Sequence, residues 1–160
     1  MASDIFLKIG NIAGEAGDSK HKGEIEIHSW AWGVNQSGSM ANGGGGGTGK
    51  ATFQDLRFTH SFDSASPNLF RACAKGEHIK EAKLTMRKAG TTPQEYLIVT
   101  MNDVIVTGVT PNGNGHDDGL LENVTLQFAK VGISYKPQLE DGSLGPGKDF
   151  MWDIKANVEG

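Results

Sequence analysis

The segment from Gly44 to Lys50 has the glycine and lysine spacing of a phosphate-binding loop. Such a loop needs a serine or threonine after the lysine to hold a magnesium ion. It must also open a helix, whose N-terminal amides then face the phosphate. Here Ala51 follows the lysine, and residues 52–56 read as a strand. The pattern therefore argues against a nucleotide site.

Other residues that could do chemistry stand alone in the sequence. Residues 114–119 are similar to the start of a calcium loop, but the twelfth position is Thr125 where a bidentate glutamate is needed. The sequence has no GxSxG turn, and its histidines form neither an HxH nor an HExxH pair, so no zinc site is expected. These histidines are His21, His28, His60, His78 and His116. We therefore predict no metal, no cofactor and no enzyme activity.

Composition excludes several classes of protein. The chain has 160 residues, with 15 lysines and arginines against 19 aspartates and glutamates, a formal net charge of −4. Such a balance does not favour nucleic-acid binding, which draws its affinity from basic side chains on phosphates. No apolar run approaches the ~20 residues of a membrane-spanning helix, and the first residues lack the cationic start of a signal peptide. We expect a single domain over residues 1–160.

Period-two alternation of apolar residues dominates the chain and predicts an antiparallel all-β fold. Residues 52–62 and 96–107 are also strand-like, with apolar residues on both faces. The clearest alternating sets are Ile5, Leu7 and Ile9; Ile25 and Ile27; Leu84 and Met86; Val124, Leu126 and Phe128; and Phe150, Trp152 and Ile154. About eight strands predict an antiparallel β-barrel built from two sheets.

Two strands reverse the phase of their alternation. The apolar set moves from Ile25 and Ile27 to Trp30 and Trp32, and again from Phe128 to the set Val131, Ile133 and Tyr135. A strand whose buried face reverses must bulge or bend, unless both of its faces are covered. We interpret both reversals as corners at which the sheet curls.

One segment, residues 66–76, has helix signals. We interpret Ser66 as the N-cap, Pro67 as the first helical residue and Gly76 as the residue just past the end, which predicts one short helix over about 66–75. Leu69, Phe70 and Cys73 are expected on its buried face, with Cys73 a small hydrophobe there. A long glycine-rich loop is predicted over about 38–50.

Taken in order along the chain, these features resemble the Hcp family, the haemolysin-coregulated proteins that form the tube of bacterial type VI secretion systems. The resemblance covers essentially the whole chain, and it is specific as an ensemble although no segment is a catalytic motif. The matching segments are residues 5–10, Gly14 with Glu15, residues 25–33, residues 36–50, residues 66–69, residues 82–90, residues 95–98, residues 122–128 and residues 152–154.

The resemblance implies a structural role. Six copies would form a ring, and rings would stack into an inner tube that carries or chaperones small effector proteins. The implied partners are further copies of the chain, the spike protein and the contractile sheath. The chain would be made in the bacterial cytoplasm and exported without a cleaved signal peptide. A free-standing ligand- or carbohydrate-binding barrel is the alternative, and an unrecognised hydrolase is a third hypothesis.

Residue assignments follow from this analogy. Trp30 and Trp32 are large enough to need burial, so Ser29 and Ala31 face outward, where their small side chains suit the wall of a lumen. A rival interpretation packs Ala31 under a loop. The glycine loop is assigned to contacts with a neighbouring subunit or ring, because residues without side chains allow close backbone approach. Its assigned residues are Gly43, Gly44, Gly45, Gly46, Gly47 and Lys50.

Overall fold

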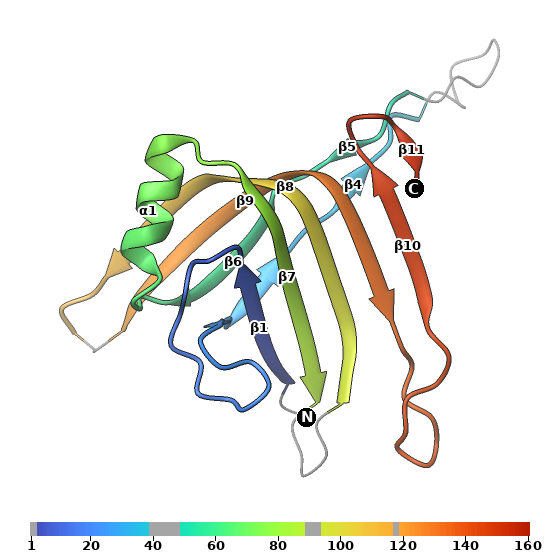
Figure 1. The fold of residues 1–160 in the computed structure, drawn as a ribbon, viewed down its shortest axis with the longest axis horizontal. Coiled ribbons are helices and arrows are strands. Elements are labelled where there is room, and N and C mark those ends of the chain that lie inside the picture. Colours follow the sequence, from blue (N-terminus) through green and yellow to red (C-terminus); the bar gives the residue numbers. More distant parts are fainter. Residues whose placement is uncertain (1–2, 39–48, 89–93, 117–118) are drawn as a thin grey trace.

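The computed structural model describes residues 3–38, 49–88, 94–116 and 119–160. Most of these residues lie in antiparallel strands, and one helix packs beside them (Figure 1). The elements are β1 Ser3–Ile9, β2 Ile25–Glu26, β3 Ser29–Ala31, β4 Val34–Asn35, β5 Thr52–Phe53, β6 Leu56–Ser61, α1 Ser66–Lys75, β7 Ile79–Lys88, β8 Gln94–Gly113, β9 Leu120–Tyr135, β10 Lys148–Asp153 and β11 Val158–Glu159. No helix within these ranges is long and apolar enough to cross a membrane.

Nine strands form one strongly curved sheet in the order β11-β10-β9-β8-β7-β1-β2, and β3 joins β6, which pairs with β9. Strands β4 and β5 form a separate two-stranded ribbon. The predicted fold class, antiparallel strands in two sheets with one short helix, is confirmed. The strand count was too low, because the apolar runs 25–35 and 52–62 are each broken into shorter strands.

The first predicted reversal is the point at which the chain passes from one side of the sheet to the other. Before it, β2 pairs with β1 and the Ile27 N–H donates to the Ile5 carbonyl; after it, the His28 N–H donates to the Thr59 carbonyl and β3 pairs with β6. The buried residues Ile25 and Ile27 thus give way to Trp30. One continuous segment therefore joins the two halves of the sheet, and this change of partner is why its buried face reverses.

The second reversal is shared by two strands. In β9 the buried set changes from Phe128 to Val131, and in β8 it changes from Met101 to Val104, where Asp103 has a φ of 55°. The two changes face each other, because the ladder pairs β8 and β9 on both sides of this point without a change of register. Tyr135, which the alternation assigned to the apolar face, is 46% exposed at the end of β9. Both strands of the β8–β9 hairpin therefore exchange their buried and outward faces at the same point.

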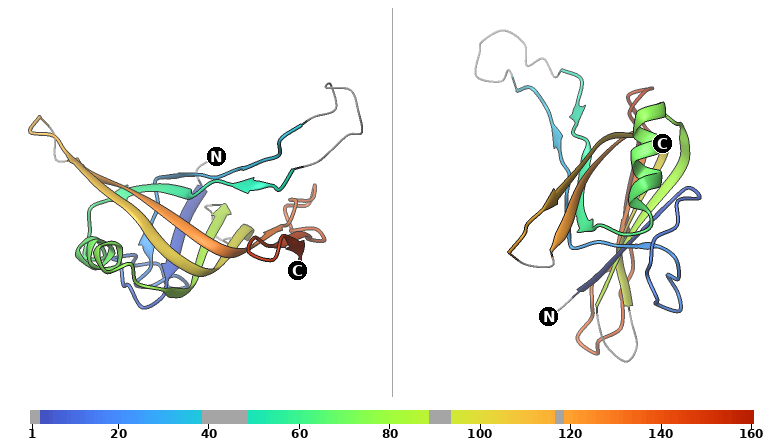
Figure 2. Two further views of the ribbon diagram at one scale, coloured as in Figure 1. Left: turned by 90° about the horizontal axis from the view of Figure 1, so that it is seen from above. Right: turned by 90° about the vertical axis from the view of Figure 1, so that its left-hand side faces the viewer.

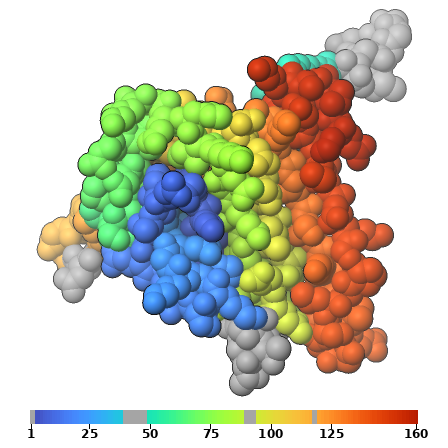
Figure 3. All heavy atoms as spheres, in the orientation of Figure 1, coloured from blue at the N-terminus to red at the C-terminus, as the bar shows by residue number. Residues whose placement is uncertain are grey.

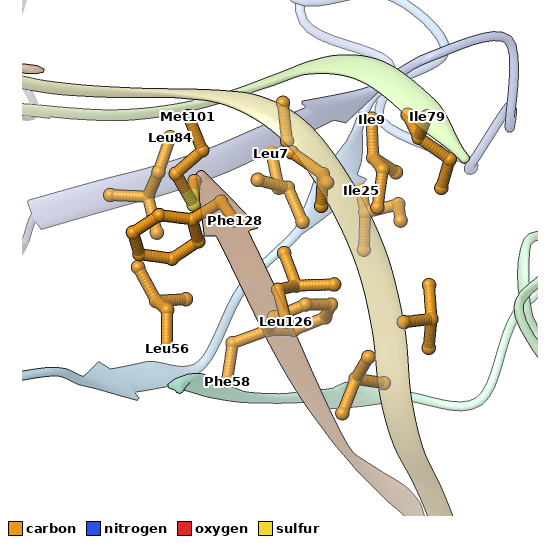
Figure 4. Packing of buried hydrophobic residues seen from close by; sticks show 14 of the residues in the cluster. Leu7, Ile9, Ile25, Leu56, Phe58, Ile79, Leu84, Met101, Leu126 and Phe128 are labelled. Carbon is orange, nitrogen blue, oxygen red and sulfur yellow. The ribbon is translucent and has the colours of Figure 1, made fainter. Parts of the chain in front are cut away.

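The core lies between these strands and α1. Figure 4 shows Leu7, Leu84 and Met101 from one part of the sheet facing Leu56, Phe58 and Leu126 from another. All six side chains are at most 1% exposed. Burial of apolar area of this kind is the dominant favourable contribution to folding. The core thus ties β6 and β9 to β1 and β7.

The helix begins and ends where the sequence predicts, but its N-terminus is built differently. Ser66 is the first helical residue and not the cap; its hydroxyl accepts the Asp63 backbone N–H at 3.1 Å, and the Asp63 carboxylate accepts the Ala65 N–H at 2.9 Å. The left-handed Gly76 ends the helix as expected. Leu69 is buried and Cys73 packs against the core, whereas Phe70, expected to be buried, is 41% exposed.

A second, polar cluster covers the outer face of β1 and β7. Phe6 stacks on the His21 ring at 4.5 Å between centroids, and the Arg87 guanidinium lies 4.9 Å from the Phe6 ring centre. Arg87 binds Asp18 through two hydrogen bonds, and this contact lowers the pKa of the Asp18 carboxyl to about 2. These contacts hold the segment between β1 and β2 against the sheet, on the face shown in Figure 3.

A buried polar pair lies beneath the turn that precedes α1. His60 and Glu122 are both fully buried on paired strands, and their Nε2 and Oε1 atoms are 2.8 Å apart. Within the part of the chain that the structure describes, His60 Nδ1 and Glu122 Oε2 have no hydrogen-bond partner. Asp63 lies 3.9 Å from His60, and burial raises the pKa of its carboxyl. The pair is therefore mutually dependent, since each member is the other's only side-chain hydrogen-bond partner among the described residues.

Replacing one member of this pair should lower the free energy of unfolding far more than replacing both. We expect Glu122→Leu to lower the free energy of unfolding by about 3–5 kcal/mol, because it leaves the buried imidazole without its acceptor. The double variant His60→Leu/Glu122→Leu should recover most of that loss, since two apolar side chains need no desolvated partner. Urea unfolding followed by tryptophan fluorescence measures both. A double variant less stable than Glu122→Leu would contradict this account.

Candidate functional site

The outward face of β3, β6, β9 and β8 forms a shallow groove of about 460 Å³. Strands β3 and β6, which contribute to this lining, run between two arms that project to the same side of the molecule, the β8–β9 hairpin and the β4–β5 ribbon (Figure 2, left). The residues that line the groove are Ser29, Trp30, Ala31, Arg57, Thr59, Thr110, Asn123 and Thr125. The groove thus contains both residues that the sequence assigned to a lumen wall.

Strand register brings these residues together in rows. Ser29 lies opposite Thr59, Thr59 opposite Asn123, and Asn123 opposite Thr110. The next outward row runs from Ala31 to Arg57, Thr125 and Gly108. Directly opposed residues of paired strands present their side chains on one face. Four segments far apart in the chain therefore contribute to one polar surface.

Hydrogen bonds between strands fix several of these side chains. The Thr59 hydroxyl donates to the Asn123 amide oxygen at 2.6 Å. The Thr107 hydroxyl donates to the Asp55 carboxylate at 2.7 Å, and it lies 2.9 Å from the Thr125 hydroxyl. Thr107 lies at a register shift of β8, between Val106 and Gly108. Thr107 faces outward next to the buried Val106, and the extra residue of this bulge lets Gly108 take the place opposite Thr125.

The shape and lining of the groove are suited to contact with another molecule. It is shallow and wide, and its lining consists mainly of short hydroxyl and amide side chains together with one arginine. A catalytic site usually brings a nucleophile or a titratable pair into a concave pocket. Among the described residues, no group of three or more histidine, cysteine, aspartate or glutamate side chains could hold a metal ion. What these rows can do is bind another polypeptide through hydrogen bonds and shape.

The sequence-predicted residues are only partly described. Ser29 and Ala31 are exposed in the groove among the described residues. Gly43, Gly44, Gly45, Gly46 and Gly47 lie outside the described residues, and Lys50 is exposed where the chain returns from that segment. Trp30 and Trp32 pack against the core as expected, with the indole N–H of Trp32 donating to the Gln54 carbonyl at 2.8 Å.

Sequence reasoning missed most of the groove. It did not single out Arg57, Thr59 or Thr110, and it gave Asn123 and Thr125 no role. The sequence did indicate that Asn123 and Thr125 face outward, because they alternate with the buried residues Val124 and Leu126 of β9. Alternation shows only that a residue faces outward, however, and cannot say which strands lie side by side. The rows therefore needed strand order and register.

Comparisons with known proteins agree over the whole chain. A family model described as "Type VI secretion system effector, Hcp" matches residues 6–135. The chain is 51% identical to a protein named hcp1 from Pseudomonas aeruginosa, with 99% of each chain covered. A crystal structure of Hcp1 from Salmonella typhimurium matches with 45% identity, 99% of each chain covered and a TM-score of 0.83. Another solved structure, titled as a type six secretion system protein, has 28% identity and a TM-score of 0.93, over 99% of this chain and 100% of that one.

The bulge at Gly108 gives a test of how tightly the groove is built. A Cβ at Gly108 would lie 2.7 Å from the Thr125 hydroxyl oxygen, whereas a Cβ at Gly115 would meet nothing within 4 Å. We expect Gly108→Ala to lower the free energy of unfolding by about 1–3 kcal/mol, because the contact forces the hydroxyl pair apart. Gly115→Ala should change it by less than about 0.5 kcal/mol. Equal effects in thermal unfolding would show that the bulge tolerates a side chain.

Proposed function

The chain belongs to the Hcp family and is a structural component of the type VI secretion tube. From this premise we propose that six copies of the chain close into a ring. The groove on the concave face of each copy would line the lumen of that ring. Rings then stack into the inner tube, which the contractile sheath propels with the spike at its tip. The chain is made in the bacterial cytoplasm and leaves the cell by this route, and small effector proteins travel in the lumen. The stacking role of Gly43–Gly47 and Lys50 remains a prediction.

The observation that supports ring closure is the distribution of exposed apolar side chains. Leu120 and Leu121, at the start of β9, are 43% and 42% exposed at one end of the long axis. Met151 and Val158, on β10 and β11, are 55% and 51% exposed at the other end (Figure 1). A closed ring needs two different patches on each subunit, each fitting the other on a neighbour. Unpartnered apolar residues at opposite ends meet that requirement.

The concave face supports the placement of the lumen. Both arms project to the side on which the groove lies, so neighbours joined end to end would turn their grooves toward a common axis. Short side chains such as Ser29 and Ala31 line that wall without narrowing it. The arrangement leaves the opposite face, with α1 and the segment between β1 and β2, on the outside of the ring.

A charge introduced into either apolar patch should prevent ring closure, and a mixture of the two variants should show whether the patches bind each other. We expect Met151→Glu or Leu121→Glu alone to yield monomers, because a buried carboxylate without a partner opposes association. An equimolar mixture of the two should form one-to-one dimers but no rings, since one intact pair of ends remains. Sedimentation velocity at micromolar concentration distinguishes these species.

The matched control is Phe70→Glu, which adds the same charge at another exposed apolar residue, on α1. It should leave the ring intact. A parent chain that is monomeric at all concentrations tested would contradict the ring and favour a free-standing binding barrel. Dimers formed by either variant alone would contradict a head-to-tail contact.

Lengthening a groove side chain should separate assembly from cargo binding. We expect Ala31→Gln to form rings as the parent does, but to retain less of the small effector proteins that co-purify with it, because the longer side chain fills part of the groove. Ala74→Gln, at an exposed residue of α1, is the matched control. Quantitative mass spectrometry of purified rings measures retention. Equal retention by all three proteins would remove Ala31 from the cargo-binding surface.

A further inference from the structure

Arg57 is the one formally charged residue among the side chains that line the groove. It is exposed on β6, directly opposite Ala31 on one side and Thr125 on the other. No hydrogen bond or ion pair to its guanidinium is found within the described part of the chain. Among the described residues, the groove therefore presents an unpaired cation with five N–H donors, between Ala31 and Thr125.

The neighbours of Arg57 leave its guanidinium available. Asp55 lies two residues earlier on the same face, but its carboxylate accepts the Thr107 hydroxyl, and it forms no ion pair with Arg57 within 4.0 Å. Ala31 is too short to cover the guanidinium, and Thr59 and Asn123 bond to each other. An arginine that the fold does not use is free to bind an anion from outside.

We propose that Arg57 is the specificity-determining residue of the groove and binds a carboxylate on an acidic segment of the cargo polypeptide. The proposal rests on the proposed function, because it identifies what the lumen wall recognises. A guanidinium binds a carboxylate through two parallel hydrogen bonds, which gives direction as well as attraction. The hydroxyls of Ser29 and Thr110 and the amide of Asn123 line the same groove and supply further partners for a polar segment.

Size and charge narrow the choice of ligand. A groove of about 460 Å³ admits a short segment or a protruding loop, but not a folded domain. Phosphates of a nucleic acid would also attract a guanidinium, but nucleic-acid binding draws its affinity from several basic side chains on successive phosphates, and Arg57 is the one formally charged side chain that lines the groove. An acidic polypeptide segment, with few charges and many hydrogen-bonding groups, fits both constraints. Six such grooves around one lumen would also add avidity for a cargo with several acidic segments.

The test uses a fluorescein-labelled glutamate-rich peptide as the probe, with fluorescence anisotropy at low salt. We expect Arg57→Gln to weaken binding by about tenfold or more, because it removes a charged pair of hydrogen bonds. Arg57→Lys should weaken it less, since a lysine keeps the charge but not the fork. Added salt should weaken binding to the parent chain and have little further effect on Arg57→Gln.

Arg71→Gln is the matched control, because it removes the same charge from an exposed arginine of α1, outside the groove. It should bind the peptide as the parent does. Any of three results would overturn the proposal: unchanged binding by Arg57→Gln, an equal loss in Arg71→Gln, or equal binding of a glutamine-rich peptide of the same length. Tighter binding of an oligothymidylate than of the acidic peptide would overturn it in favour of nucleic acid.

The same measurement on the Met151→Glu variant separates this proposal from the ring. All residues that line the groove come from one chain, so a monomer contains a complete groove. If the parent chain does not form rings but still binds the peptide through Arg57, the ring fails and the acidic-segment site stands. If rings form and Arg57→Gln binds unchanged, the ring stands and this inference fails.

Discussion

The inversion of the buried face within the β8–β9 hairpin is the constraint on which the rest of the fold depends. A strand presents its side chains to alternate faces, so a hairpin that serves two differently oriented halves of a sheet must reverse its phase between them. Asp103, with its φ of 55°, takes up this reversal in β8, between the paired residues Asn102–Lys130 and Val104–Phe128. One part of β9 can then pair with β6 while the other pairs with β10.

A second phase reversal, in the segment between β2 and β3, follows from the same alternation of side chains along a strand. The segment from Ile25 to Ala31 leaves β1 and joins β6, and its phase reverses at the point of exchange. Because β3 is then fixed beside β6, which pairs with β9 on its other side, the outward residues of these three strands and of the end of β8 come to lie in common rows. The concave polar face thus results from the strand order and register that bring these segments together.

The two polar clusters show different uses of charge. Arg87 is nearly buried but has Asp18, Asp4 and the Phe6 ring around it, so its charge is compensated and it serves the fold. His60 and Glu122 likewise bind each other inside the protein. Arg57 differs from both, because it is exposed and no residue of the described chain compensates it. Burial with a partner indicates a structural charge, whereas exposure without one in a groove favours a role in recognition.

The sequence by itself determined the local features of this protein. Period-two alternation identified the main strands, both phase reversals and the outward direction of Ser29 and Ala31, because the face of a strand residue depends only on its place in the pleat. Proline and glycine likewise located α1 between Ser66 and Gly76, since their backbone preferences act locally.

Only the tertiary structure decided which of these features meet. Thr59, Thr110 and Asn123 lie in one row because of strand order and register, which arise from long-range pairing that no local pattern encodes. Phe70 was assigned to the core by its helical spacing but is exposed, because the buried face of α1 is the one with Ser66, Leu69 and Ala72, and spacing alone cannot show where that face ends. Arg57 was an ordinary outward residue in the sequence. Its isolation became visible only once the neighbouring strands were in place, because a charge is unpaired only relative to what surrounds it.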